Sequence, residues 1–259
     1  MFRSLQIAAT GMIAQETKLD SIANNLANAN TAGFKRQDAE FEDLLYQTQR
    51  GVGRGPNGAA MPAVQLGSGS RVVATPRSFA QGAIQQTGNP LDVAIEGGGF
   101  LAVTRDDGMT GYTRAGSLQL DPTGQLVTSD GLPIQPQLTL PANATSIAIA
   151  SNGTITAQIP GTTAPTQVGK LQLTTFPNPA GLSAVGHNLF EATEASGEPS
   201  AGDAQVDGRG SFMQGAVEGS NVEVVTEMIA LVSTQRAYEI NSKVIQAADE
   251  MLRNATQAR

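Results

Sequence analysis

The chain has 259 residues, of which 40% are hydrophobic but only 4% aromatic, and its formal charge at neutral pH is −7. This acidic balance argues against a nucleic-acid partner, which would need clustered Lys and Arg, and it disfavours binding to anionic lipid. The absence of cysteine excludes disulfides and thiolate metal sites, and no stretch approaches the roughly 18 apolar residues that span a bilayer.

Glycine and proline shape the overall composition. With Gly 29 and Pro 13, these two residues make up roughly 16% of the chain, above the usual ~12%. This excess favours a turn-rich β body over a helical or doubly wound fold. At the N-terminus, Gln6 and Thr10 interrupt the apolar run and Arg3 is the lone basic residue, so we expect no cleaved signal peptide.

The N-terminal segment, residues 1–36, carries a helical pattern. Seven apolar residues recur at heptad spacing: Leu5, Ala8, Met12, Leu19, Ile22, Leu26 and Ala29. The pattern predicts one amphipathic helix over residues 4–29. Thr31-Ala32-Gly33 follows as a stop, because Gly tolerates the left-handed conformation that ends helices. Gly11 lies inside the predicted helix, where it is tolerable if another backbone passes closely.

Residues 37–71 form a connector that is rich in glycine and proline. Eight of the nineteen residues 51–69 are Gly or Pro, which is typical of a flexible linker. The same stretch contains Val52, Met61, Val64 and Leu66, which a solvated linker has little reason to carry. An extended docked loop and a disordered linker both remain open.

Residues 72–214 are predicted to form an antiparallel β domain. Short runs with β-type composition occur at Leu91–Ile95, Phe100–Val103, Ser117–Leu120, Ile147–Ile149, Thr154–Thr156 and Leu171–Phe176. Residues suited to tight reversals lie between them at Asp107–Gly108, Asp121–Gly124, Asp130–Gly131 and Asn152–Gly153.

The C-terminal segment, residues 215–259, repeats the helical pattern. Its apolar positions are Val224, Met228, Leu231, Tyr238, Ile245 and Leu252. They predict a second helix over residues 221–254, capped by Ser220 or Asn221. The expected fold is therefore α+β: two terminal helices form a coiled-coil-like pair, with an antiparallel all-β domain and the Gly/Pro-rich loop inserted between them.

Residues that could carry out chemistry are few. His187 has no second metal ligand nearby and lies in a turn-like context, and Asp106-Asp107 fits the polar tip of a hairpin better than a paired-carboxylate site. The runs at 51–55 and 97–99 lack the Gly-Lys-Ser/Thr ending of a phosphate loop, so close strand packing explains them better. We predict no catalytic residue, no metal site and no cofactor.

Five segments carry a resemblance to a known family, the rod and hook proteins of the bacterial flagellum. The N-terminal ones are Ala9–Met12, Leu19–Asn28 and Thr31–Lys35, and the C-terminal ones are Ser220–Val222 and Gln235–Lys243. Within that family, Phe41–Gln47 and Gly88–Phe100 look like the distal rod branch, and the chain length fits that branch or its closest proximal relative.

The resemblance implies a structural subunit without enzyme activity, which polymerises into a rigid helical tube that transmits torque and provides an export channel. Implied partners are further copies of itself, the proximal rod, the hook, the P and L ring proteins and the flagellar type III export apparatus, with assembly in the periplasm. The assembly interface would comprise Leu5, Met12, Leu19, Ile22, Leu26, Val224, Met228, Leu231, Tyr238, Ile245 and Leu252. Alternatives are a proximal rod subunit, or a ligand-binding β module with a helical oligomerisation stalk.

Charge in the connector is unevenly distributed. No carboxylate lies between Asp43 and Asp92, and that interval contains Arg50, Arg54, Arg71 and Arg77. One interpretation is a compositional accident. The other is a clasp in which these arginines hold carboxylates of neighbouring subunits, since the planar guanidinium can donate two hydrogen bonds to one carboxylate.

Overall fold

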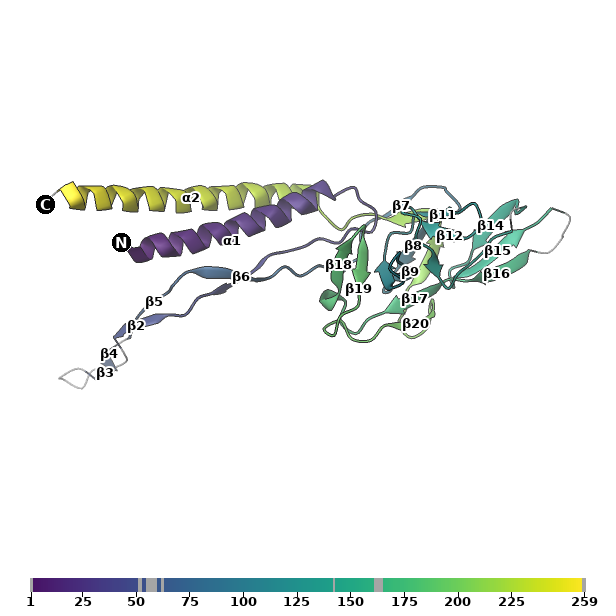
Figure 1. Ribbon diagram of the computed structural model, residues 1–259, viewed down its shortest axis with the longest axis horizontal. Coiled ribbons are helices and arrows are strands. Elements are labelled where there is room, and N and C mark those ends of the chain that lie inside the picture. Colours follow the sequence, from purple (N-terminus) through teal and green to yellow (C-terminus); the bar gives the residue numbers. More distant parts are fainter. Residues whose placement is uncertain are drawn as a thin grey trace. The chain divides into compact units, whose positions relative to one another are not determined.

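The computed structural model describes residues 2–50, 53–54, 60–61, 63–141, 143–160 and 165–257. The fold is α+β, with a helix at each end of the chain and antiparallel sheets between them (Figure 1). The chain divides into two compact units. The first unit is Met1–Ala27, Gln37–Pro76 and Glu223–Arg259, and the second is Asn28–Arg36 and Arg77–Val222.

Two antiparallel helices form the frame of the first unit. Helix α1 spans Phe2–Ala27 and helix α2 spans Val224–Gln257, and they lie side by side in Figure 1. Gly11 of α1 faces the Asn241 side chain of α2, whereas Asn25, further along α1, binds Glu227, further back along α2. This order fixes the antiparallel direction.

Both helices were predicted, but the residues expected to end α1 and to begin α2 have other roles. Helix α1 ends at Ala27, so Gly33 is not its cap. Gly33 has a φ of 71°, and a Cβ there would lie 2.6 Å from the Ala115 nitrogen, so its place is decided by close backbone packing. Asn221 does not cap α2 either, because its side chain binds the backbone of Arg36, Ser78 and Ala80.

A two-stranded ribbon completes the first unit. Strand β1 (Glu40–Asp43) pairs with β6 (Ser70–Ala74), β2 (Gln47–Arg50) with β5 (Val64–Leu66), and β3 (Gly53–Arg54) with β4 (Ala60–Met61), all antiparallel. The ribbon contacts α1, because the Arg3 guanidinium of α1 donates to the Leu66 carbonyl of β5 at 2.7 Å. Val52 and most of the glycines at the predicted loop tip lie outside the described residues.

The second unit is built from antiparallel sheets. Its largest sheet has the order β13 (Ile134–Gln135), β9 (Leu101–Thr104), β10 (Thr110–Thr113), β19 (Leu189–Glu191) and β18 (Ser183–Gly186). Another has the order β14 (Ser146–Ile149), β15 (Thr154–Gln158) and β16 (Thr166–Lys170). The remaining pairs are β11 (Leu118–Leu120) with β12 (Leu126–Thr128), β17 (Gln172–Thr175) with β20 (Ser200–Asp203), β21 (Ser211–Gln214) with β8 (Val93–Glu96), and β22 (Ala216–Glu218) with β7 (Ile84–Gln86). A short 3₁₀ helix spans Pro179–Gly181.

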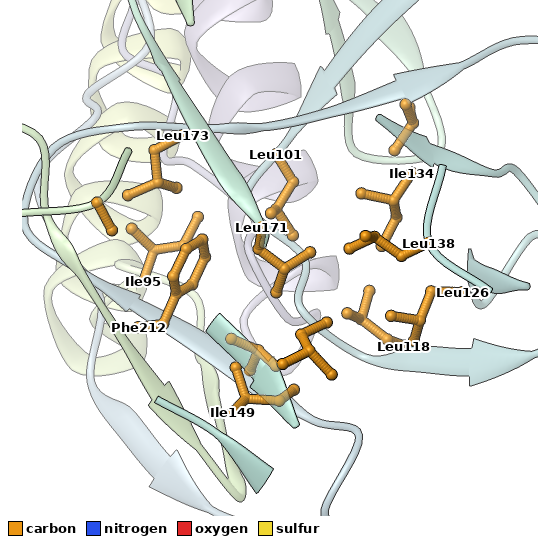
Figure 2. Packing of buried hydrophobic residues seen from close by; sticks show 14 of the residues in the cluster. Ile95, Leu101, Leu118, Leu126, Ile134, Leu138, Ile149, Leu171, Leu173 and Phe212 are labelled. Carbon is orange, nitrogen blue, oxygen red and sulfur yellow. The ribbon is translucent and has the colours of Figure 1, made fainter. Parts of the chain in front are cut away.

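Aliphatic side chains from many of these strands pack in one core. Each strand is short, so the core is built from small contributions of many strands. Figure 2 shows Ile95, Leu101, Leu171 and Phe212 meeting in it. A second cluster is aromatic: Phe79, Phe100, Phe176 and Phe190 pack edge to face with centroids 5.2–6.0 Å apart. Four of the eight Phe residues are therefore concentrated at one place, where ring pairs add to the burial of area.

The predicted turns between strands are confirmed. Gly108, Gly124, Gly131 and Gly153 all have φ near +80°. At Gly153, a Cβ would also lie 2.5 Å from the Leu171 carbonyl, so a larger residue would separate β15 from the strand that follows it. The glycine run at 97–99 is likewise a place of close packing, because the Gly210 N–H donates to the Gly98 carbonyl at 2.8 Å.

A fully buried charged cluster joins the start and the end of the second unit. The Glu218 carboxylate accepts hydrogen bonds from Lys35 Nζ at 2.6 Å, Arg114 Nε at 2.7 Å and the Gly82 N–H at 2.9 Å. Lys35 also donates to the Ala80 carbonyl, and Arg114 to the Gly97 carbonyl. Every partner is thus engaged, which is the condition under which charges tolerate burial.

This cluster contains two cations and one carboxylate, and that imbalance sets the pKa values. Burial alone raises the pKa of Glu218, but Arg114, Lys35 and the Gly82 N–H outweigh it, so the pKa lies below its ordinary value of 4.5. Desolvation, together with Arg114, lowers the pKa of Lys35 in spite of the bond to Glu218.

The lowered pKa of Glu218 predicts acid sensitivity. In the unfolded chain the carboxyl returns to its ordinary pKa, so the unfolded state binds more protons in acid. The stabilisation is complete above pH 4.5 and is lost as the pH falls through the lower, folded-state value. Urea unfolding at pH 7 and pH 3, followed by circular dichroism, should show that Glu218→Gln costs about 3–5 kcal/mol at pH 7 and reduces the difference between the two pH values.

The matched control is Asp203→Asn, which breaks the half-exposed ion pair with Lys170. It should change stability by at most about 1 kcal/mol. An unchanged pH dependence in Glu218→Gln would contradict the assignment.

Candidate assembly surfaces

The fully buried residues of the two helices are mostly small or polar. On α1, Ala8, Ala14 and Ile22 are buried together with Ser21 and Asn25. On α2, the buried residues are Glu227, Thr234 and Ala248, which are seven or fourteen residues apart. Small side chains allow two helices to approach closely. The Gly11 position is one example, because a Cβ there would lie 3.1 Å from Asn241 Nδ2, so a side chain and not a backbone occupies the space.

Asn25 fixes the pair to the ribbon as well. Its Oδ1 accepts from the Gln37 N–H at 2.9 Å, while its Nδ2 donates to the Gln37 carbonyl at 2.8 Å and to Glu227 Oε2 at 3.4 Å. One buried amide therefore joins α1, α2 and the first residue of the connector. Buried polar groups with satisfied bonds define a single register better than apolar contacts do.

The apolar heptad residues that the sequence predicts for the assembly interface differ in their exposure. Ile22 is buried, and Leu5, Met12, Leu19, Leu26, Leu231, Ile245 and Leu252 are half-buried. Val224, Met228 and Tyr238 are exposed. The row of Glu227, Thr234 and Ala248 was missed because two of its residues are polar, although its spacing is also heptad.

An apolar stripe runs along the other side of α2. Val225, Ile229 and Ile240 are 65%, 66% and 61% exposed, and Met228 and Val232 lie between them. Ser233, Arg236 and Ala237 adjoin these residues on the same open surface of the helix. At 3.6 residues per turn, the stripe lies about opposite the row that faces α1. A helix that is buried on one side and apolar on the other is suited to a second helical partner.

The ribbon also exposes apolar side chains. Leu45, Tyr46 and Val73 are exposed, and Phe41 lies 6.0 Å from Lys18 Nζ of α1. Two of the predicted clasp arginines have partners within the chain: Arg71 pairs with Glu42, and Arg77 donates to the Lys35 carbonyl at 3.3 Å. The side chains of Arg50 and Arg54 lie outside the described residues.

One surface hollow gathers the titratable residues that the sequence considered for chemistry. Asp106, Asp107, Asp130 and His187 line it together with Arg105. Arg105 binds Asp107 at 2.8 Å and Glu191 at 3.4 Å, and His187 lies 3.6 Å from Asp130 with its side chain exposed. His187 has a φ of 52°, in agreement with the predicted turn. Across the described ranges, no three His, Cys, Asp or Glu side chains are arranged to hold a metal ion.

No helix among the residues that the structure describes is both long enough and apolar enough to cross a membrane. The surfaces that remain are a helix pair with an apolar outer stripe, an apolar ribbon and a closed β unit. Together they define the class of a structural assembly protein.

Comparison with known proteins identifies the family. Three family descriptions match: flagella basal body rod protein at residues 5–35, the D1 domain of flagellar hook protein FlgE/F/G at 94–157, and the C-terminal part of flagellar basal body rod FlgEFG protein at 213–258. The chain is 47% identical to the flagellar basal-body rod protein FlgG of Buchnera aphidicola subsp. Baizongia pistaciae, covering 97% of this chain and 98% of the relative.

Relatives with the same name also come from two further organisms. The FlgG protein of Caulobacter vibrioides is 44% identical over 99% of both chains, and that of Bacillus subtilis is 38% identical over 97% of both. The chain belongs to the FlgG family of flagellar basal-body rod proteins, a structural and not an enzymatic family.

The geometry of Gly69 predicts how the ribbon is held. Gly69 has a φ of 112°, and a Cβ there would overlap the Thr10 hydroxyl of α1. Gly69→Ala should therefore loosen the ribbon base. The Leu44 N–H donates to the Gly69 carbonyl at 2.8 Å, and its amide exchange should accelerate about tenfold or more.

Gly186→Ala is the matched control, because Gly186 also has a positive φ of 92° but has nothing within 4 Å of an added Cβ. This variant shows the effect of placing Ala at a positive φ without any overlap between the added Cβ and a neighbouring atom. Adding Thr10→Ala to Gly69→Ala should restore part of the protection. Equal exchange at Leu44 in Gly69→Ala and the parent would rule out docking at this position.

Proposed function

We propose that this chain is a structural subunit of the flagellar distal rod, which polymerises into a rigid helical tube that transmits torque to the hook and encloses an export channel. The observation that carries the proposal is the exposed apolar stripe of α2, formed by Val225, Met228, Ile229, Val232 and Ile240. Exposed apolar stripes of this kind are typical of interaction surfaces. Family membership indicates the assembly to which the surface belongs.

The occupant of the stripe is a second copy of the chain. Helix α1 exposes Ile13, which is 63% exposed, as an apolar side chain that such a copy could offer. A contact between unlike surfaces of two copies does not close on itself, so its repetition gives an open helical filament. In such a filament the helices would form the inner tube and the β units the outer wall.

The helix pair supports a coiled-coil-like arrangement. Gly11 and Asn25 are separated by two heptads, as are Asn241 and Glu227, which face them. Equal separations on both helices keep one register along that length. The predicted interface residues Leu5, Met12, Leu19 and Leu26 of α1, and Leu231, Ile245 and Leu252 of α2, would become fully buried on assembly.

Each segment of the chain has its own role in the proposed assembly. Residues 1–36 and 215–259 serve assembly, 37–71 connect neighbouring copies, and 72–214 form the outer wall. Export through the flagellar type III apparatus would deliver the chain to the periplasm. There it would contact the proximal rod, the hook, and the P and L ring proteins.

A charge placed in the stripe should prevent assembly. Ile229→Asp puts a carboxylate on a 66% exposed side chain, so the isolated chain should keep its fold, but the copy-to-copy contact would have to desolvate an unpaired charge. Electron microscopy should show no tubes, while circular dichroism and thermal unfolding stay unchanged.

Gln246→Asp adds the same charge on an exposed polar residue of α2 beyond Ile240, where the stripe ends, and it should assemble normally. Leu231→Asp should also block assembly, but it is a less clean probe because Leu231 is already half-buried. Tubes of normal length from Ile229→Asp would exclude the stripe as the contact.

The clasp proposal makes a mechanical prediction. Arg71 has 64% of its side chain exposed beside Glu42, so it could exchange this partner for a carboxylate of another copy. Replacing Arg50, Arg54, Arg71 and Arg77 by Gln should give tubes that bend more and dissolve at lower salt, since exposed pairs are weak singly but repeat along a polymer. Bending is measured from electron micrographs, with Arg253→Gln, which removes an exposed pair with Asp249 on α2, as the control. Equal straightness and salt resistance would mean that the charge asymmetry has no mechanical role.

A further inference from the structure

Four chain crossings connect the two units, and the residues beside them in the second unit are tied together. The crossings follow from the unit bounds: Ala27 to Asn28, Arg36 to Gln37, Pro76 to Arg77, and Val222 to Glu223. Any force between the helices and the β unit that travels along the chain must pass through these four segments. Whether it enters at one point or at four separate points depends on what joins them.

Asn221 joins three of the crossings with one side chain. It lies one residue before the last residue of the second unit. Its Oδ1 accepts from the Arg36 N–H at 2.7 Å, beside the second crossing, and its Nδ2 donates to the Ser78 and Ala80 carbonyls at 2.8 and 3.1 Å, beside the third. The amide therefore has both donors and its acceptor engaged by two other segments of the chain.

Glu218 and its cations anchor the same segments in the β core. The Gly33 N–H, on the segment that follows the first crossing, donates to the Glu218 carbonyl at 2.8 Å. The Glu218 carboxylate holds Lys35 and Gly82, which belong to the segments at the second and third crossings, and Arg114 of the β core. The Ser78 N–H adds a bond to the Arg36 carbonyl at 2.8 Å.

We propose that Asn221, with the buried Glu218 cluster behind it, is a mechanical junction that makes the four crossings act as one attachment point. Without it, force on α2 would peel β22 from β7 one bond at a time. With it, the same force is shared by the segments at 33–36, 78–82 and 218–221. The role matters because the chain is proposed to carry torque, but the junction can be tested in the single chain without assembly.

The test is single-molecule pulling on the full-length monomer. The chain contains no cysteine, so introduced cysteines give defined attachment points. One pair, Val225→Cys and Asp106→Cys, applies force from the start of α2 into the β unit. A second pair, Asp106→Cys and Glu198→Cys, applies force within the β unit alone; all three positions are exposed.

Asn221→Ala removes three hydrogen bonds, so the lifetime at constant force between positions 225 and 106 should shorten about tenfold or more. The lifetime between positions 106 and 198 should not change. Asn178→Ala is the matched control, because Asn178 also donates from its side chain to a backbone carbonyl, that of Ala195, but it lies away from the crossings. It should leave the 225–106 lifetime unchanged.

Two results would overturn the junction. One is a 225–106 lifetime in Asn221→Ala equal to that of the parent. The other is an equal shortening for both attachment pairs, which would mean that the substitution only destabilises the β unit. Glu218→Gln, if it folds by circular dichroism, should shorten the 225–106 lifetime as well. If the parent chain forms no tubes, the proposed function is contradicted. The pulling experiment would still decide whether the junction exists, because it uses the monomer.

Discussion

A single carboxylate, that of Glu218, determines how the β unit is closed. It lies at the end of the last strand, β22. It accepts hydrogen bonds from Lys35, which comes from the segment just after α1, and from Arg114 in the middle of the unit. Three distant parts of the chain can be buried together because every charge and donor in the cluster has a partner. The signature Thr31–Lys35 is thus explained by packing: Gly33 makes a close backbone approach and Lys35 reaches the carboxylate.

The helix pair follows a different physical rule. Its fully buried positions are mostly small or polar, such as Ala14, Asn25 and Thr234, while several large apolar residues of α2 are exposed on the other side. In an isolated soluble protein the arrangement would normally be reversed, because burial of large apolar side chains gives the main stabilisation. The reversal is understandable if the outer side is covered in an assembly, so the folding of the unit and its polymerisation use different faces of one helix.

Much of the fold could be predicted from local patterns. Heptad spacing indicated both terminal helices to within three residues, and period-two runs with Asp-Gly and Asn-Gly turns located strands and reversals. These features depend on neighbouring residues alone. The rejection of His187 and Asp106 as parts of a chemical site also rested on local turn context, yet only the structure shows that they share one hollow with Arg105.

The sequence by itself determined the α+β class, the helices, the turns and the family, because each depends on short-range spacing or on short motifs. The tertiary structure decided which side of α2 faces α1, and it assigned Asn221 and Gly33 to backbone packing instead of helix capping. It also brought Lys35 to Glu218 across 183 positions of sequence separation. Such choices cannot be derived from spacing, because a polar residue that caps a helix and one that joins distant strands have the same local appearance. Long-range partners alone distinguish them.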